Sequence, residues 1–158
     1  MKQRRSIKST DEQLCLTLPL PPSINEQYYT DMVGNRRLTP AALRYKTEVQ
    51  KILLNLQHQG ILNESLFKRM GACYLALYIE FYFPTPLRRD LDSGLKILLD
   101  AICGGLRAND NRVVELHLNK RICPQDPHVY IEIDTLDKWD FDEEYSVLPR
   151  GSKNEALP

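Results

Sequence analysis

Side chains alternate strictly from residue 73 to residue 83, and this pattern limits the possible folds more than any other in the chain. One set of alternate positions is apolar: Cys73, Leu75, Leu77, Ile79, Phe81 and Phe83. The other set is Tyr74, Ala76, Tyr78, Glu80 and Tyr82. A period of two places each set on its own face of a β-strand. Pro84 and Pro86 end the strand because proline lacks the N–H that a strand ladder requires.

Helical spacing replaces this alternation on either side of the strand. Thr39 and Pro40 are typical of a helix start, as N-cap and first residue, and Gly60 is a typical stop. Apolar residues recur between them at helical spacing: Tyr45, Val49, Ile52, Leu53 and Leu56. A second helix is predicted from about Asp90 to Leu106, with Leu91, Leu95, Leu98, Ile102 and Leu106 as its buried stripe. Residues 61–71 fit neither pattern clearly.

Shorter segments complete the predicted order of strands and helices. Residues 14–18 read as a strand that stops at Pro19, and residues 33–36 as the turn of a small hairpin. Alternation predicts two more strands, around residues 114–119 and 129–133. The order is that of an α+β domain in which two main helices pack on one mixed β-sheet.

Composition divides the chain into three parts. Its 158 residues suffice for one domain with a buried core, which we place at residues 13–134. Residues 1–12 are expected to be a flexible basic arm, and residues 135–158 an acidic tail without fixed structure. Residues 1–123 carry 18 Lys and Arg against 12 Asp and Glu, whereas residues 124–158 carry 3 against 9. A basic body is compatible with a polyanion as partner.

The same composition argues against a membrane protein and against a disulfide-stabilised one. No apolar run approaches the ~20 residues that a membrane helix needs, and no membrane partner is expected. The four cysteines are far apart and show no CxxC spacing. This usage predicts reduced thiols in the cytoplasm rather than a zinc site.

Charged residues cluster where the long strand gives way to the second helix. Residues 88–92 read Arg-Arg-Asp-Leu-Asp, Lys96 follows Asp92 by four positions, and Asp110 lies in the polar turn before the next strand. Carboxylates at a helix start and a strand start can meet at one edge of a sheet. Hard oxygen ligands of this kind suit Mg²⁺. A divalent cation would also relieve the repulsion between these carboxylates and a phosphodiester.

Each of these residues also has a purely structural explanation. Aspartates are common at helix starts, where they cap the helix and face the positive end of its dipole. Lys96 could form a surface ladder with Asp92 and Asp100. Asp110 could serve the turn alone, and Glu80 reads better as a carboxylate on the sheet face than as support for a metal site. The spacing of these residues therefore leaves both explanations open.

Several motifs, taken in order, resemble the RusA family of Holliday-junction resolvases. Residues 88–96 are similar to that family's RRDLDxxxK, and Asp110 begins a D-x-x-V-V turn into a strand. Residues 18–25, followed by Tyr28 and Tyr29, resemble the family's opening LPxPPSxNxxY. The resemblance covers about residues 14–134. Two positions depart from the pattern: Ser93-Gly94 follows the second aspartate where the family often has Asn, and Asn109 replaces the first aspartate of a D-D pair.

The resemblance implies a site and a reaction. It implies Asp90, Asp92 and Asp110 as metal-binding carboxylates and Lys96 as the catalytic lysine. The expected cofactor is Mg²⁺, with Mn²⁺ as a substitute, in metal-assisted hydrolysis of a phosphodiester. The expected activity is paired, symmetric nicking of four-way junction DNA by a homodimer, in recombination and repair.

Further polar residues are candidate DNA contacts, of the kind that position a nucleic acid without specifying its sequence. They are Arg36, Arg37, Arg88, Arg89, Lys120, Arg121, Asn25 and Tyr29. Some of these are expected to be only surface charge or to brace the proline-rich segment. Two other functions remain as alternatives: a junction-binding protein without useful catalysis, and a DxD metal enzyme acting on nucleotides or sugars. The second alternative lacks a glycine-rich phosphate loop in this sequence.

Overall fold

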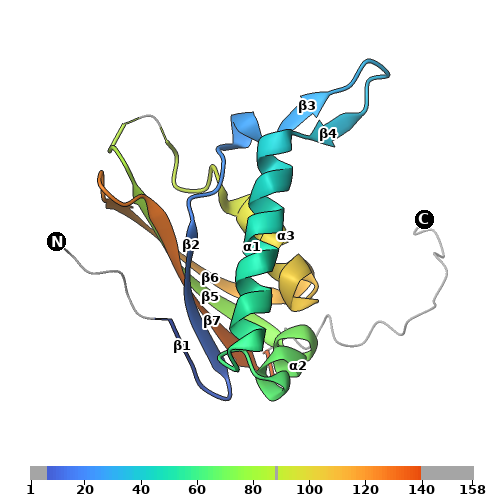
Figure 1. The fold of residues 1–158 in the computed structure, drawn as a ribbon, viewed down its shortest axis with the longest axis vertical. Helices are drawn as coiled ribbons and strands as arrows, with labels where there is room; N and C mark the ends of the chain where they lie inside the picture. Colours follow the sequence, from blue (N-terminus) through green and yellow to red (C-terminus); the bar gives the residue numbers. More distant parts are fainter. Residues whose placement is uncertain (1–6, 88, 140–158) are drawn as a thin grey trace, which may run out of the picture.

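The computed structural model describes residues 7–87 and 89–139, which form a mixed β-sheet with helices on one face (Figure 1). The first half contains strands β1 (Lys8–Ser9) and β2 (Gln13–Pro19), the short 3-10 helix η1 (Ile24–Glu26), strands β3 (Tyr28–Thr30) and β4 (Arg36–Leu38), and helices α1 (Pro40–His58) and α2 (Glu64–Ala72). The second half contains β5 (Tyr74–Phe83), α3 (Leu95–Leu106), the 3-10 helix η2 (Asp110–Arg112), β6 (Val113–Ile122) and β7 (His128–Leu136). The α+β class predicted from the sequence is confirmed.

The main sheet has five strands in the order β1-β2-β7-β5-β6. Strands β5 and β6 are parallel, and the other neighbours in the sheet are antiparallel. Ile131 of the central strand β7 pairs with Leu16 on one side and with Ile79 on the other. A parallel pair needs a crossover connection, and α3 lies in it between β5 and β6. The residues at both ends of α3 are therefore held by the sheet.

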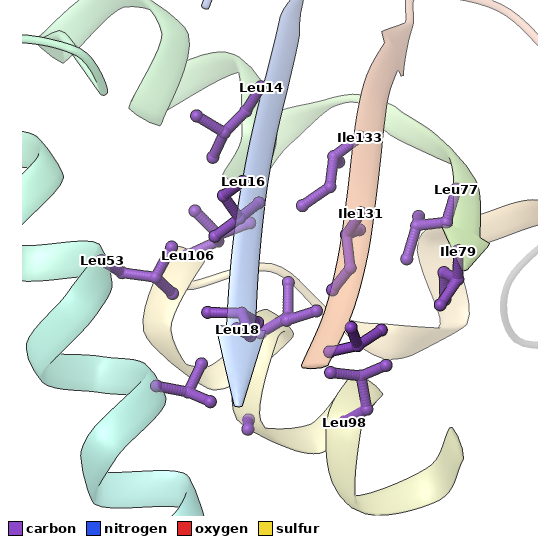
Figure 2. Packing of buried hydrophobic residues seen from close by; sticks show 14 of the residues in the cluster. Leu14, Leu16, Leu18, Leu53, Leu77, Ile79, Leu98, Leu106, Ile131 and Ile133 are labelled. Carbon is purple, nitrogen blue, oxygen red and sulfur yellow. The ribbon is translucent and has the colours of Figure 1, made fainter. Parts of the chain in front are cut away.

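The apolar face of the sheet packs against α1 and α3 (Figure 2). Leu14, Leu16 and Leu18 of β2 lie beside Ile131 and Ile133 of β7 and face Leu53, Leu98 and Leu106 of the helices. All of these side chains are at most 1% exposed. On β5, the predicted apolar residues from Leu75 to Phe83 are buried as the alternation required. Burying this face supplies the main stabilisation of the fold.

Helix α2 is the element that the sequence left ambiguous. Asn63 caps it, accepting a hydrogen bond from the backbone N–H of Leu66, and only Leu66 and Met70 of its nine residues are buried. Two buried positions in so short a helix give a weak periodic signal. The small hairpin was predicted correctly: β3 and β4 pair antiparallel, and Gly34 in the turn has a φ of 89°. It projects beyond the start of α1 (Figure 1).

The ends of the sheet differ from the predicted arm and tail. Lys8 and Ser9 pair with Cys15 and Leu14, so the sheet begins inside the expected arm. Thr10 stabilises the intervening bend by accepting a hydrogen bond from the backbone N–H of Gln13. At the other end β7 continues to Leu136, and Trp139 packs against Tyr74. Residues 1–6 and 140–158, which include most of the predicted tail, lie outside the described residues.

The second helix begins later than predicted. Residues 91–94 are turns, and α3 starts at Leu95 with Gly94 as its N-cap. The backbone N–H groups of Ser93 and Leu95 donate to the carbonyls of Asp90 and Asp92. These bonds close two successive turns, so Asp90 and Asp92 precede the helix. The prediction that Asp92 and Lys96 share a helix face is therefore wrong.

None of the described helices is long and apolar enough to cross a membrane. The cysteines Cys15, Cys73, Cys103 and Cys123 are all free thiols, as their spacing predicted.

Candidate functional site

Asp90 and Asp92 lie in the turns between β5 and α3. We call residues 89–94 the aspartate turn. Both aspartates are exposed, and they line an open cavity of about 460 Å³ together with Lys96, Ser93 and Ile24. The exposed carboxylates leave their oxygens accessible from solvent, so this cavity can receive a cation or a charged ligand.

Lys96 lies in the first turn of α3 and reaches two further carboxylates. Its Nζ is 2.5 Å from Oδ1 of Asp100, one helical turn along, and 3.3 Å from Oδ2 of Asp110 at the start of η2. Hydrogen bonds and charge attraction from these carboxylates, with Asp100 contributing most, raise the pKa of Lys96. The surface ladder considered from the sequence is thus half right: Lys96 pairs with Asp100 and not with Asp92.

A second open cavity, of about 440 Å³, is lined by the two carboxylates that Lys96 contacts. It is lined by Asp100 and Asp110 and by two cationic side chains, Lys46 of α1 and Arg107 at the end of α3. The buried Cys103 also lines it. Burial and the nearby carboxylates of Asp110 and Asp100 raise the pKa of the Cys103 thiol to about 11. Lys96 therefore lines the cavity of Asp90 and Asp92 and contacts two carboxylates that line the second cavity.

The donor chemistry of the site fits Mg²⁺. This ion is usually bound by one or two carboxylates together with water and substrate phosphates, in place of a complete protein cage. Asp90 and Asp92 provide two such groups on one cavity. Within residues 7–87 and 89–139, no three His, Cys, Asp or Glu side chains gather closely enough to hold a metal ion. The three-aspartate set therefore remains a prediction, with Asp110 placed beside Lys96.

The hairpin displays three of the predicted DNA contacts. Tyr29 is 50% exposed. The guanidinium of Arg36 lies over the ring of Tyr28, 4.0 Å from its centre. Arg37 donates to Asp31 at 2.9 Å. Arg36 and Arg37 are both exposed residues despite these contacts. Asn25, in η1, is also exposed.

The basic residues near the aspartate turn and on β6 have protein partners. The guanidinium of Arg89 is turned inward: it donates to the carbonyl of Pro21 and to Oγ of Ser93. Lys120 donates to the carbonyl of Arg89 at 2.8 Å. Arg121 donates to Glu80 at 3.2 Å. Arg88 lies outside the described residues. Through these contacts, Arg89 ties the aspartate turn to Pro21, and Lys120 ties it to β6.

Glu80 lies on the sheet face, as the sequence favoured. Its side chain is fully buried, and it accepts hydrogen bonds from the hydroxyls of Tyr78 and Tyr82 and from Arg121. These partners satisfy a buried carboxylate.

Three further residues near the site, Lys46, Arg107 and Gln27, carry no signal in the sequence that predicts their position. Lys46 and Arg107 gain their position only because α1 packs on α3, which no local pattern encodes. Gln27 is the one buried polar residue between the proline-rich segment and the hairpin. A polar residue beside a run of prolines is the expected sequence of a surface loop, so the sequence contained no signal of its burial.

Comparison with known proteins gives the family. The profile of the family described as Endodeoxyribonuclease RusA matches residues 19–134. The crossover junction endodeoxyribonucleases RusA of Shigella sonnei (strain Ss046) and Escherichia coli (strain K12) are each 31% identical to this chain over 106 residues. Those residues are 66% of this chain and 80% of each relative.

The matched family is one of nucleases, enzymes that hydrolyse phosphodiester bonds within DNA. The chain belongs to the RusA family of endodeoxyribonucleases. The matched residues include Asp90, Asp92, Lys96 and Asp110, together with the whole of α1, α3 and β5. The resemblance inferred from the motifs is confirmed.

Proposed function

We propose that this protein is a divalent-metal-dependent endonuclease that resolves four-way DNA junctions by paired nicks. Membership of the RusA family supports the reaction class, and two relatives bear the name crossover junction endodeoxyribonuclease. The observation that carries the proposal is the placement of Lys96. Lys96 lines the cavity of Asp90 and Asp92, and its ammonium contacts the carboxylate of Asp110.

Asp90 and Asp92, with Asp110, are the residues proposed to hold Mg²⁺ or Mn²⁺. When bound, such an ion supplies Lewis-acid polarisation of a phosphoryl oxygen and a lower pKa for bound water. Without a cation, the same carboxylates would repel the DNA backbone. The aspartates therefore make both the approach of a phosphate to the site and its cleavage depend on the ion.

Lys96 is proposed to stabilise negative charge that develops on the phosphate during cleavage. An ammonium has three N–H donors, and Asp100 and Asp110 accept two of them. The third can point to a phosphate oxygen. The Lys96 side chain is 56% exposed, so a backbone phosphate can reach it. A fixed cation at the reacting phosphate is a typical source of transition-state stabilisation.

The DNA backbone is proposed to contact two basic regions. One is the projecting hairpin with Arg36, Arg37 and Tyr29. The other is the cavity beside Asp110, where Lys46 makes no hydrogen bond or ion pair with the described part of the chain. Contacts of this kind fix the register of a duplex arm without reading its sequence.

A homodimer is proposed because one chain offers a single candidate site. Resolving a junction takes nicks in two strands of like polarity. An open four-way junction has two-fold symmetry, and a two-fold dimer places equal sites on its two related strands.

The test is cleavage of an end-labelled four-way junction by wild-type and Asp92→Asn protein, with and without Mg²⁺. The proposal requires paired nicks by the wild type only with the metal, and none by the variant. Binding of the junction without cleavage would favour the junction-binding alternative. A linear duplex of the same sequence serves as the control substrate, and equal cleavage of both would exclude selectivity for junction structure.

A further inference from the structure

The aspartate turn is joined to the proline-rich segment by one buried side chain. We call residues 20–27 the proline loop. The side chain of Gln27, at the end of this loop, is fully buried. Its Nε2 donates to the carbonyl of Pro22 at 3.1 Å and to the carbonyl of Ser93, also at 3.1 Å. One carboxamide thus bridges two segments that are 66 residues apart.

The backbone of Gln27 is itself fixed to the start of α1. Its carbonyl accepts from the N–H of Thr39 at 2.9 Å. Thr39 is the N-cap of α1, and its hydroxyl donates to the carbonyl of the neighbouring Glu26 at 2.5 Å. The Gln27 side chain therefore projects from a rigid base, which is what a positioning group requires.

The chemistry of the bridge requires a primary amide in one orientation. Both partners are carbonyl oxygens, so both need an N–H donor. If the amide were turned over, its oxygen would face two other oxygens, so the network decides the orientation. The Oε1 of Gln27 is buried and has no hydrogen-bond partner among the described residues. A buried unpaired oxygen is unfavourable. In Gln27 it accompanies the two hydrogen bonds that the Nε2 of the same amide donates to Pro22 and Ser93.

The aspartate turn needs such external support. It belongs to no helix or strand. It carries two exposed carboxylates two residues apart, which repel each other. Close packing against the same loop adds to the restraint: a Cβ at Gly94 would lie 2.6 Å from Cγ of Pro21. Arg89 adds a hydrogen bond to the carbonyl of Pro21.

We propose that Gln27 is a positioning residue that holds the aspartate turn, and so Asp90 and Asp92, in place before metal and DNA bind. The inference rests on the proposed function for its catalytic consequence. Gln27 itself does not line the cavity of the aspartates. It acts through the Ser93 carbonyl, one residue after Asp92.

Three substitutions separate the loss of the bridge from a general loss of loop stability. Gln27→Leu keeps a similar volume and removes both donors. Ser23→Ala is the matched control, because among the described residues Ser23 forms hydrogen bonds only with Glu26, within the proline loop, and none with the aspartate turn. Gln27→Glu is a second test: it keeps the size and places carboxylate oxygens against the two carbonyls. Thermal unfolding confirms that each variant folds.

The first measurement is amide hydrogen exchange in the metal-free protein. Exchange of the peptide covering residues 90–96 is expected to be about tenfold faster in Gln27→Leu than in wild type or Ser23→Ala, because local opening governs exchange. Unchanged exchange in Gln27→Leu would overturn the proposal. This measurement stands even if the protein does not cleave junctions, so failure of the proposed function remains distinguishable.

The second measurement is Mn²⁺ binding by calorimetry, together with cleavage kinetics. Loss of a residue that orients metal ligands weakens metal binding or activity by about 10–100-fold. We expect Gln27→Leu to bind Mn²⁺ about tenfold more weakly than Ser23→Ala does, with kcat reduced at low metal and restored at high metal. The KM for the junction should stay unchanged. A fall in kcat together with an equal-fold rise in KM, neither of which excess metal reverses, would refute a positioning role.

Discussion

The Nζ of Lys96 lies 3.3 Å from Oδ2 of Asp110, although 14 residues separate the two in the sequence. The contact joins the first turn of α3 to η2, which follows the last turn of α3 in the chain. Because α3 is the crossover between the parallel strands β5 and β6, the sheet fixes both of its ends. The relation between the lysine and the aspartate is therefore set by the core of the protein.

Replacing an aspartate of the candidate site should separate cleavage from binding. Asp90→Asn, Asp92→Asn and Asp110→Asn each remove a hard oxygen ligand and also one repulsion toward phosphate. We expect cleavage to be lost while junction affinity is kept or increased. Gel-shift titration in Ca²⁺ measures affinity, and a nicking assay in Mg²⁺ measures cleavage. Near wild-type nicking by any of the three variants would remove that residue from the site.

Replacing Lys96 should lower turnover much more than affinity. One cation is a small part of the total attraction to DNA, whereas a cation at the reacting phosphate is worth about 3 kcal/mol in the transition state. Lys96→Ala should therefore reduce kcat by about 100-fold and change Kd little. Lys51→Ala, an exposed lysine of α1, is the control. A parallel fall in kcat and affinity would make Lys96 a simple phosphate contact.

The protein should form a two-fold dimer in solution. Sedimentation at micromolar concentration should give about twice the 18.3 kDa mass of the chain. Junction binding should weaken steeply with salt, because a dimer that spans four arms releases many counterions. A stable monomer that makes both nicks in one binding event would contradict the symmetry argument.

The Cys103 thiol should report the electrostatics beside Asp110. Its pKa is raised to about 11, chiefly by burial and then by the charges of Asp110 and Asp100. The neutral thiol therefore dominates at pH 8, and alkylation should accelerate about tenfold per pH unit from pH 8 to pH 10. Asp110→Asn removes a negative charge, lowers the pKa of this thiol and should speed alkylation at pH 8. Peptide mass spectrometry follows the rate at Cys103. The ratio of the rates at pH 10 and pH 8 cancels the effect of limited access. It should be about 100, and a ratio of about 10 or less, which a thiol of ordinary pKa gives, would contradict the raised pKa.

Local sequence was sufficient for the elements with a long, regular pattern. The alternation from Leu75 to Phe83 determined a strand with one buried face, and Thr39-Pro40 determined the start of α1. Hydrophobic period and capping chemistry act within one element, so they can be read without knowing the fold. The motifs around Asp90, Asp92 and Asp110 likewise sufficed to indicate the family.

Only the tertiary structure decided which side chains meet. Lys96 pairs with Asp100 and Asp110 rather than Asp92, because residues 91–94 form turns and α3 begins at Leu95. Arg89 turns inward to the proline loop, Lys46 reaches the cavity of Asp110, and Gln27 is buried against Ser93. These contacts join segments far apart in the chain. Their energies depend on how the helices pack on the sheet, which no local pattern specifies.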